Sequence, residues 1–106
     1  MCGRYAIYGP VSRASPDVIE FLGEEIAFES TYNAAPTRNL PILRESSAGK
    51  RELALLRWGL VPSWAKDPAI GARMINARSE TVAEKPAFRS AFRRRRCLVP
   101  MCGFYE

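Results

Sequence analysis

The sequence contains no histidine. This absence excludes a Ser-His or Cys-His catalytic pair within the chain, together with the commonest zinc ligand sets. Only three cysteines are present, and Cys97 and Cys102 are not spaced as a zinc pair. No stretch approaches the roughly 18 consecutive apolar residues of a membrane span, and the N-terminus lacks the apolar run of a signal peptide. The sequence therefore predicts reduced thiols in a cytoplasmic compartment, with no metal, no other cofactor and no membrane partner.

Length and charge predict one small domain with a polyanionic partner. Hydrophobic residues make up 47% and charged residues 25% of the 106 residues, which is ordinary for a globular protein. Lys and Arg total 16 against 11 acidic residues, giving a net charge of +5 and a pI near 9.5. Such a balance favours nucleic acid as the partner. The arginines are concentrated between positions 89 and 96, although the run Arg93 to Arg96 can equally be a solvated face.

Short extended segments dominate the predicted secondary structure. Strands are expected over residues 3–8, 40–44, 52–58, 97–100 and 103–105, and short helices over 15–23, 79–83 and 88–93. Residues 32–37 are expected to form a loop and 45–50 a hairpin turn, with an irregular or helical connection over 65–72. The expected fold class is α+β, with a mainly antiparallel sheet that curls into a barrel-like shape. The apolar run over 97–106 carries no polar tail, which indicates an incomplete domain.

The second residue, Cys2, carries the most distinctive chemistry. Methionine aminopeptidases remove an initiator Met before a small side chain, which would leave Cys2 with a free α-amine and a thiol on adjacent carbons. Their reference pKa values of about 7.7–8.0 and about 8.5 leave both groups partly deprotonated near neutral pH. The amine can form an imine with an aldehyde, and the thiolate can then close a thiazolidine ring. Taken alone, Cys2 can also be an arbitrary residue at a frayed terminus.

Five sequence blocks occur in a characteristic order. They are Met1-Cys2-Gly3-Arg4-Tyr5, Tyr32-Asn33-Ala34-Ala35-Pro36, Trp58-Gly59-Leu60-Val61-Pro62, Ile75-Asn76-Ala77-Arg78-Ser79-Glu80-Thr81 and Gly103-Phe104-Tyr105-Glu106. Together they resemble the SOS-response-associated peptidase (SRAP) domain family, the sensors of abasic sites in single-stranded DNA. The family domain is about twice as long, so the resemblance implies that residues 1–106 are the N-terminal portion of a single domain.

The resemblance also implies roles for individual residues. Cys2 corresponds to the nucleophile that traps the ring-opened aldehyde of an abasic site as a thiazolidine. Asn76 corresponds to the residue that orients the terminal amine and the sugar, and Glu106 to the acid/base carboxylate. Arg4 and Arg78 match positions that hold DNA phosphates. The family's catalytic histidine lies in the second half of its domain, beyond the residues matched here.

Several candidate residues also have a structural interpretation. Asn33 is either a DNA contact or a turn-former before the Ala-Ala-Pro segment. Trp64 is a candidate for stacking on an exposed base, whereas Trp58 is expected to pack in the core. Glu106 can be a terminal charge alone. Cys97 and Cys102 are expected to be small buried hydrophobic residues.

Three functions remain open from the sequence. The first is covalent trapping of abasic sites in single-stranded DNA, with lyase activity as an accompanying reaction. The second is a thiol peptidase whose N-terminal Cys2 acts as the nucleophile, including on its own leader. The third is a non-catalytic basic module that binds single strands. An incomplete domain with an open apolar side is also expected to self-associate.

Overall fold

The computed structural model describes residues 2–9 and 28–105, and the structural statements below concern these residues. The predicted helix over 15–23 and the candidate carboxylate Glu106 lie outside them. No helix in the described part of the chain is long and apolar enough to cross a membrane.

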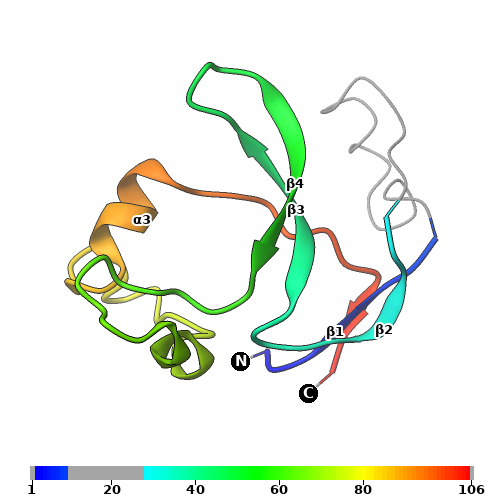
Figure 1. Cartoon of the computed structure of the whole chain (residues 1–106), viewed down its shortest axis with the longest axis horizontal. Coiled ribbons are helices and arrows are strands. Elements are labelled where there is room, and N and C mark those ends of the chain that lie inside the picture. Colours follow the sequence, from blue (N-terminus) through cyan, green and yellow to red (C-terminus); the bar gives the residue numbers. More distant parts are fainter. Residues whose placement is uncertain (1, 10–27, 106) are drawn as a thin grey trace.

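The described elements are five strands, one 3-10 helix and one α-helix. In chain order they are β1 (Tyr5–Ile7), β2 (Thr31–Ala34), β3 (Asn39–Glu45), β4 (Arg51–Arg57), η1 (Pro68–Arg73), α3 (Arg89–Arg94) and β5 (Gly103–Phe104). They form a three-stranded sheet in the order β2-β1-β5 and a two-stranded sheet of β3 and β4, all antiparallel. Figure 1 shows the β3–β4 ribbon crossing above β1 and β2, with α3 on the opposite side. The predicted α+β class with antiparallel pairing is confirmed.

The β3–β4 hairpin forms where the sequence predicts it. Its ladder pairs Leu40 with Leu56 and Arg44 with Glu52. The turn closes through backbone hydrogen bonds from Ser46 to Lys50 at 2.8 Å and from Gly49 to Ser46 at 2.9 Å. Gly49 has φ 80°, a conformation that residues with a Cβ rarely adopt. The hairpin is therefore determined locally, by a glycine-containing turn between two apolar strands.

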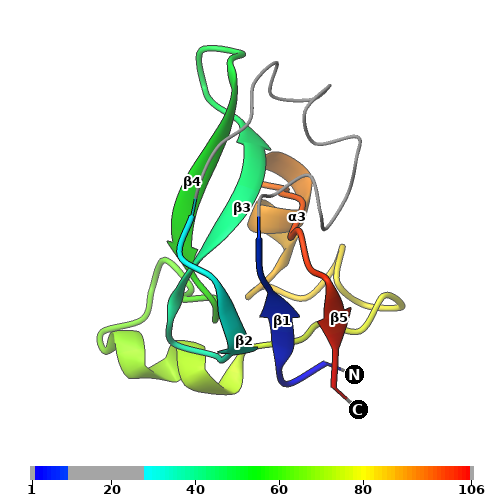
Figure 2. The same ribbon diagram turned by 90° about the vertical axis from the view of Figure 1, so that its right-hand side faces the viewer.

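Strand β1 lies at the centre of the three-stranded sheet. All three of its residues are buried, and Ile7 is completely inaccessible. Its neighbours are β2 and β5, which come from distant parts of the chain (Figure 2). The core packs around it from Tyr5, Ile7, Ala34 and Leu40, with partly buried Cys2, Phe28, Trp58 and Met101 against these four.

Several predicted elements differ from the structure. Residues 31–34 form β2 rather than part of a loop, because β1 supplies the pairing partners of Thr31 and Ala34. Residues 79–83 form turns instead of a helix, since Pro86 lacks the N–H that would continue one. The predicted strand over 97–100 is reduced to one isolated bridge between Leu43 and Leu98. The predicted helix over 88–93 is confirmed as α3.

The sheet does not close into a barrel. Among the described strands, β4 pairs only with β3, and β5 pairs only with β1. Large apolar side chains remain exposed on these two strands, including Leu55 at 62% and Phe104 at 59%. The fold is thus two adjoining open sheets, with apolar surface on their free sides.

Candidate functional site

Cys2 and Asn76 are in contact just before the N-terminal end of β1. The side-chain amide of Asn76 donates a hydrogen bond of 2.9 Å to the carbonyl oxygen of Cys2. The Cys2 thiol is partly buried and lies 3.4 Å from the carbonyl oxygen of Arg4. Because Asn76 engages the backbone of Cys2, its contact positions the residue without consuming the thiol. Of the predicted catalytic residues, the structure therefore brings Cys2 and Asn76 together, while Glu106 lies outside the described residues.

Trp58 connects the two segments that carry Cys2 and Asn76. Its indole N–H donates a hydrogen bond of 3.0 Å to the carbonyl oxygen of Ile75, the residue before Asn76. Its ring packs against Tyr5, with ring centroids 5.5 Å apart and an interplanar angle of 47°. Tyr5 lies on β1, three positions after Cys2. Trp58 therefore links the segment of Asn76 to β1, in addition to the packing role predicted for it.

The residues after Trp58 make a second link to the segment that precedes Asn76. The backbone N–H of Leu60 donates a hydrogen bond of 3.0 Å to the carbonyl of Met74. Gly59 has φ 125°, and a Cβ at this position would overlap the backbone of Gly71 in η1. Glycine is thus required at position 59 for both its conformation and the close approach of η1.

An apolar cavity of about 550 Å³ lies against Cys2. Its other lining residues are Tyr5, Leu40, Ile42, Leu56, Arg57, Trp58, Gly59, Leu60, Val61, Arg95, Cys97, Val99 and Met101. Burial raises the pKa of Tyr5 to about 12, assisted by the neighbouring Cys2 and Cys97 thiols and opposed by Arg38. Tyr5 therefore remains a neutral phenol at physiological pH and presents no charge to Cys2.

The other two cysteines differ from the prediction of buried hydrophobic residues. Cys97 is exposed because its segment makes only a single bridge to β3, and Cys102 is partly buried. Partial burial of the thiol still raises the pKa of Cys97, opposed by the charge of Arg44. Cys97 is therefore not an activated thiolate. Within the described residues, no three Cys, Asp or Glu side chains are grouped so that they could hold a metal ion.

The predicted phosphate-binding arginines are close in sequence to Cys2 and Asn76. Arg4 is two positions after Cys2, and Arg78 is two positions after Asn76. Both are exposed, and neither forms an ion pair with a described carboxylate. The Arg4 guanidinium donates a hydrogen bond of 2.8 Å to the carbonyl of Gly3. Both guanidinium groups are thus open to solvent and available to a ligand.

Asn33 and Trp64 lie on separate surface segments. Asn33 is exposed on β2, and its carbonyl accepts a hydrogen bond of 2.7 Å from the Arg38 guanidinium. Trp64 is 60% exposed, in a turn closed by a hydrogen bond from Ala65 to Pro62. No described hydrogen bond joins either residue to Cys2 or Asn76. Their exposure leaves both side chains available to a ligand, but the site does not depend on them for its geometry.

Sequence reasoning missed the supporting roles of Tyr5 and Trp58. Both residues stand in the characteristic sequence blocks, but an aromatic side chain in a strand signals only burial. The hydrogen bond from Trp58 to Ile75 joins positions 17 apart, and no periodicity in the sequence marks it.

Comparison with known proteins identifies the family of the chain. The profile of the family described as "SOS response associated peptidase (SRAP)" matches residues 1–106. The chain is 42% identical over 111 residues to the abasic site processing protein YoaM of Bacillus subtilis, covering 100% of this chain and 47% of YoaM. It is 35% identical over 95 residues to the abasic site processing protein HMCES of Xenopus tropicalis, covering 79% of this chain and 28% of HMCES.

A solved structure has the same fold. A crystal structure of a protein from Bordetella bronchiseptica superposes with a TM-score of 0.73 at 24% identity, covering 99% of this chain and 50% of that one. The chain spans about half the length of the curated Bacillus relatives it matches. The profile match over every residue, together with these relatives, establishes that the chain belongs to the SOS response associated peptidase (SRAP) family.

Proposed function

We propose that this chain senses abasic sites in single-stranded DNA and traps them covalently through Cys2, protecting the lesion during the DNA damage response. The observation that carries the proposal is the hydrogen bond from Asn76 to Cys2, which joins two sequence blocks 74 positions apart at the residue with the distinctive nucleophiles. The names of the relatives, abasic site processing proteins, support the choice of lesion. Residues 1–106 act in this proposal as the N-terminal portion of a single domain.

The proposed reaction begins after Met1 has been removed. The α-amine of Cys2 adds to the aldehyde carbon of the ring-opened sugar, and the resulting carbinolamine loses water to give an imine. The thiol sulfur then bonds to the imine carbon while its proton passes to the nitrogen, which closes the thiazolidine ring. Loss of water requires a proton donor, a role suited to a carboxyl group such as that of Glu106. β-Elimination from the imine would give the associated lyase activity: a proton leaves the carbon next to the imine carbon, the 3′ phosphate departs as the leaving group, and hydrolysis of the imine then releases the protein.

Asn76 and the exposed polar residues provide positioning. Asn76 holds the Cys2 backbone, which directs the terminal amine and thiol toward one sugar. Arg4 and Arg78 supply charge for the phosphates beside the lesion, and they retain it because no described carboxylate neutralises either one. Trp64 offers a ring on which an unpaired base can stack, and Asn33 offers an amide for a hydrogen bond.

Two other functions make different predictions. A thiol peptidase would use the Cys2 thiol on a peptide carbonyl and would form an acyl-enzyme. A non-catalytic module would bind intact and abasic strands alike, consistent with the net charge of +5. The non-catalytic module does not explain why the backbone of position 2 is held by a residue from a distant segment, whereas the thiol peptidase would share this contact and differ in its product.

The decisive experiment mixes the purified protein with an abasic single strand and analyses the product under denaturing conditions. Intact mass first establishes whether Met1 has been removed. We expect a heat-stable adduct with the wild-type chain, and with Cys2→Ser an imine that is detected only after borohydride reduction. A stable adduct formed by Cys2→Ala would contradict the thiazolidine mechanism, and equal binding of intact and abasic strands without any adduct would favour the non-catalytic module.

A further inference from the structure

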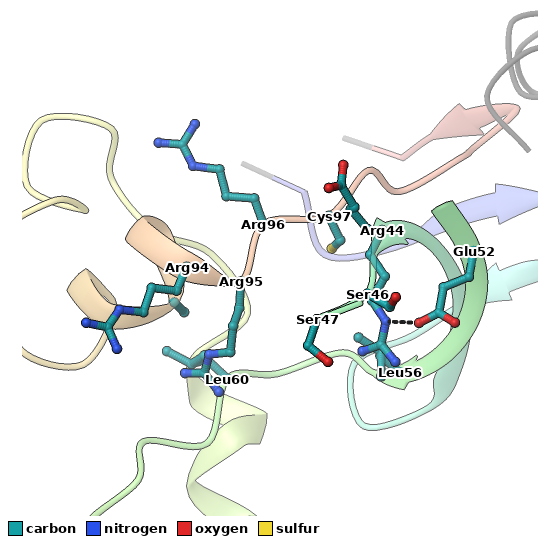
Figure 3. Close-up of a pocket in the computed structure, with 12 residues that line it drawn as sticks. Arg44, Ser46, Ser47, Glu52, Leu56, Leu60, Arg94, Arg95, Arg96 and Cys97 are labelled. Atoms are coloured by element: carbon teal, nitrogen blue, oxygen red, sulfur yellow. Dashed lines mark hydrogen bonds and ion pairs between the residues drawn. The ribbon is translucent and has the colours of Figure 1, made fainter. Parts of the chain in front are cut away.

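One further hollow adjoins the cavity at Cys2, and a second hollow adjoins the first. The first is a cleft of about 800 Å³ between the β3–β4 hairpin and the segment after α3 (Figure 3). The cleft shares with the Cys2 cavity a common wall formed by Leu56, Leu60, Arg95 and Cys97. The cleft and the Cys2 cavity are therefore neighbours on the surface of the protein.

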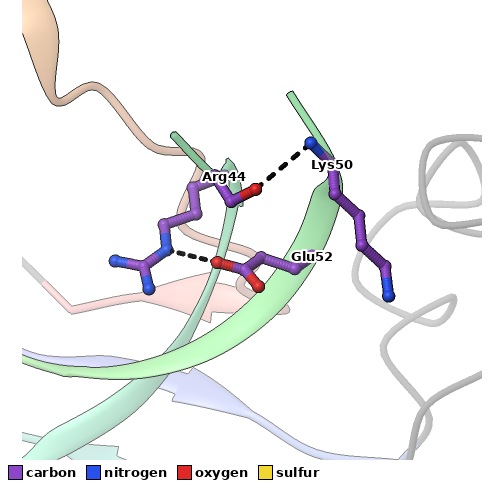
Figure 4. Close-up of polar contacts among 4 residues, drawn as sticks. Arg44, Lys50 and Glu52 are labelled. Carbon is purple, nitrogen blue, oxygen red and sulfur yellow. Dashed lines mark hydrogen bonds and ion pairs between the residues drawn. The ribbon is translucent and has the colours of Figure 1, made fainter. Parts of the chain in front are cut away.

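Positive charge dominates the cleft. Four arginines and two glutamates line it: Arg44, Arg94, Arg95, Arg96, Glu45 and Glu52. Arg44 is neutralised by Glu52, at 2.9 Å across the β3–β4 ladder, and the side chain of Lys50 extends away from this pair (Figure 4). The remaining arginines thus leave the cleft with excess positive charge.

The arginines of the cleft are not equivalent. Arg96 donates a hydrogen bond of 2.7 Å to the carbonyl of Phe92 and lies over its ring, 3.9 Å from the centroid. Arg94 and Arg95 are exposed, and within residues 2–9 and 28–105 neither has a carboxylate partner. In Figure 3 their guanidinium groups lie on the side of Leu60, whereas Arg96 extends in the opposite direction. Arg94 and Arg95 are therefore the two guanidinium groups available to an anion.

The second hollow continues the same line of charge. It measures about 490 Å³, lies along α3 and is lined by Arg89, Ser90, Arg93 and Arg94. Arg94 lines both hollows, so the charge is continuous from Arg95 beside the Cys2 cavity to the start of α3. We call the four residues Arg95, Arg94, Arg93 and Arg89 the arginine track.

We propose that the arginine track binds successive backbone phosphates of the DNA strand on one side of the lesion held at Cys2. This inference rests on the proposed function and adds a path for the strand. Guanidinium groups suit phosphate oxygens because their N–H donors match them in pairs. The hydroxyl groups of Ser46 and Ser47 line the same cleft and add hydrogen-bond donors on the hairpin side. The track contains no base-specific arrangement, so it would bind strands of any sequence.

The test measures binding instead of crosslinking. Two single strands of about twelve nucleotides, a length within the range that such grooves cover, carry a non-reactive tetrahydrofuran analogue of the lesion near the 5′ or the 3′ end. We expect the double variant Arg94→Ala/Arg95→Ala to bind one of the two strands more weakly. Its log–log salt slope for that strand should be less steep by about 1.4, because each lost phosphate contact removes about 0.7.

Two further variants separate the track from net charge and from folding. Lys50→Ala/Lys85→Ala also removes two positive charges, one at the hairpin tip and one in the turn before α3. This variant should leave the difference in affinity between the two strands unchanged. Arg94→Lys/Arg95→Lys keeps the charges and should retain most of the salt slope. Circular dichroism confirms that each variant is folded.

The outcomes distinguish this inference from the proposed function. Three results would each overturn the arginine track. The salt slope of Arg94→Ala/Arg95→Ala could be unchanged for both strands, or its affinity could fall equally for both strands. The third is that Lys50→Ala/Lys85→Ala loses the same affinity for the same strand. Because the analogue has no aldehyde, a protein that fails to crosslink would still report on the track. If crosslinking fails but Arg94→Ala/Arg95→Ala still shows the expected loss of binding to one strand, only the covalent mechanism is contradicted.

Discussion

Asn76 donates its side-chain hydrogen bond to the backbone of Cys2, not to the thiol. The contact therefore constrains where the backbone of Cys2 lies and leaves the thiol outside the hydrogen bond with Asn76. An amide side chain suits this role because its N–H can donate to a carbonyl oxygen without adding a charge.

Replacing Asn76 tests this positioning role. We expect Asn76→Ala to slow single-turnover crosslinking by about two- to tenfold, the loss of one hydrogen bond of about 0.5–1.5 kcal/mol. Asn76→Asp should be slower still, because a carboxylate would face the carbonyl oxygen of Cys2. The matched control is Asn39→Ala at the exposed start of β3. Equal rates for Asn76→Ala and the control would contradict the role.

Trp58 is expected to act through Asn76. Trp58→Phe retains a ring against Tyr5 but removes the N–H that binds the carbonyl of Ile75. Stability should fall by about 1 kcal/mol, and crosslinking should slow while the affinity for single strands is retained. The double variant Trp58→Phe/Asn76→Ala should be no slower than Asn76→Ala, because the two changes disrupt one linkage. If the fold-decreases in rate of the two single variants multiply in the double variant, Trp58 has only a packing role.

Arg78 is expected to contribute to affinity through charge. Arg78→Ala should weaken binding to single strands and make the log–log salt slope less steep by about 0.7, the contribution of one phosphate. Fluorescence anisotropy over a salt series measures both quantities. Arg78→Lys should retain the slope because it keeps the charge. An affinity independent of salt would assign the exposed arginines to a solvated face with no role in binding.

Tyr5 predicts a pH dependence of stability at alkaline pH. Its pKa rises from 10.0 to about 12 on folding, because burial disfavours the phenolate. The unfolded chain therefore loses this proton first, so the contribution is complete below pH 10 and is lost as pH rises toward 12. Denaturant unfolding of Tyr5→Phe should show a smaller decline than wild type over that window. Identical pH profiles would show that Tyr5 titrates as an ordinary tyrosine.

The open apolar edge of β4 is expected to cause self-association. Leu55 is 62% exposed on β4, which pairs only with β3 among the described strands. Leu55→Lys should shift the chain toward monomer in sedimentation experiments, because a charge on an exposed edge opposes strand pairing. Ala83→Lys in the exposed turn region adds the same charge elsewhere and serves as the control. A wild-type chain that is monomeric at all concentrations would contradict this prediction.

Local signals in the sequence were sufficient for part of the fold. The hairpin could be predicted because its turn includes Gly49 and its strands are apolar, so the pairing joins residues close in sequence. α3 could be predicted from Phe88 and Phe92, four positions apart, and the structure has the corresponding backbone hydrogen bond at 2.8 Å. The chemistry of Cys2 also follows from its position alone.

Only the tertiary structure decided which residues lie around Cys2. β2 becomes a strand because β1 lies beside it, and the free edges of β4 and β5 leave the sheet open where a closed one was expected. Asn76 reaches Cys2 because Trp58 binds the preceding carbonyl and packs against Tyr5. These contacts join residues far apart in sequence, and their free energy depends on packing that no local pattern encodes. The sequence by itself therefore determined which side chains are candidates for the proposed chemistry, and long-range packing determined which of them meet.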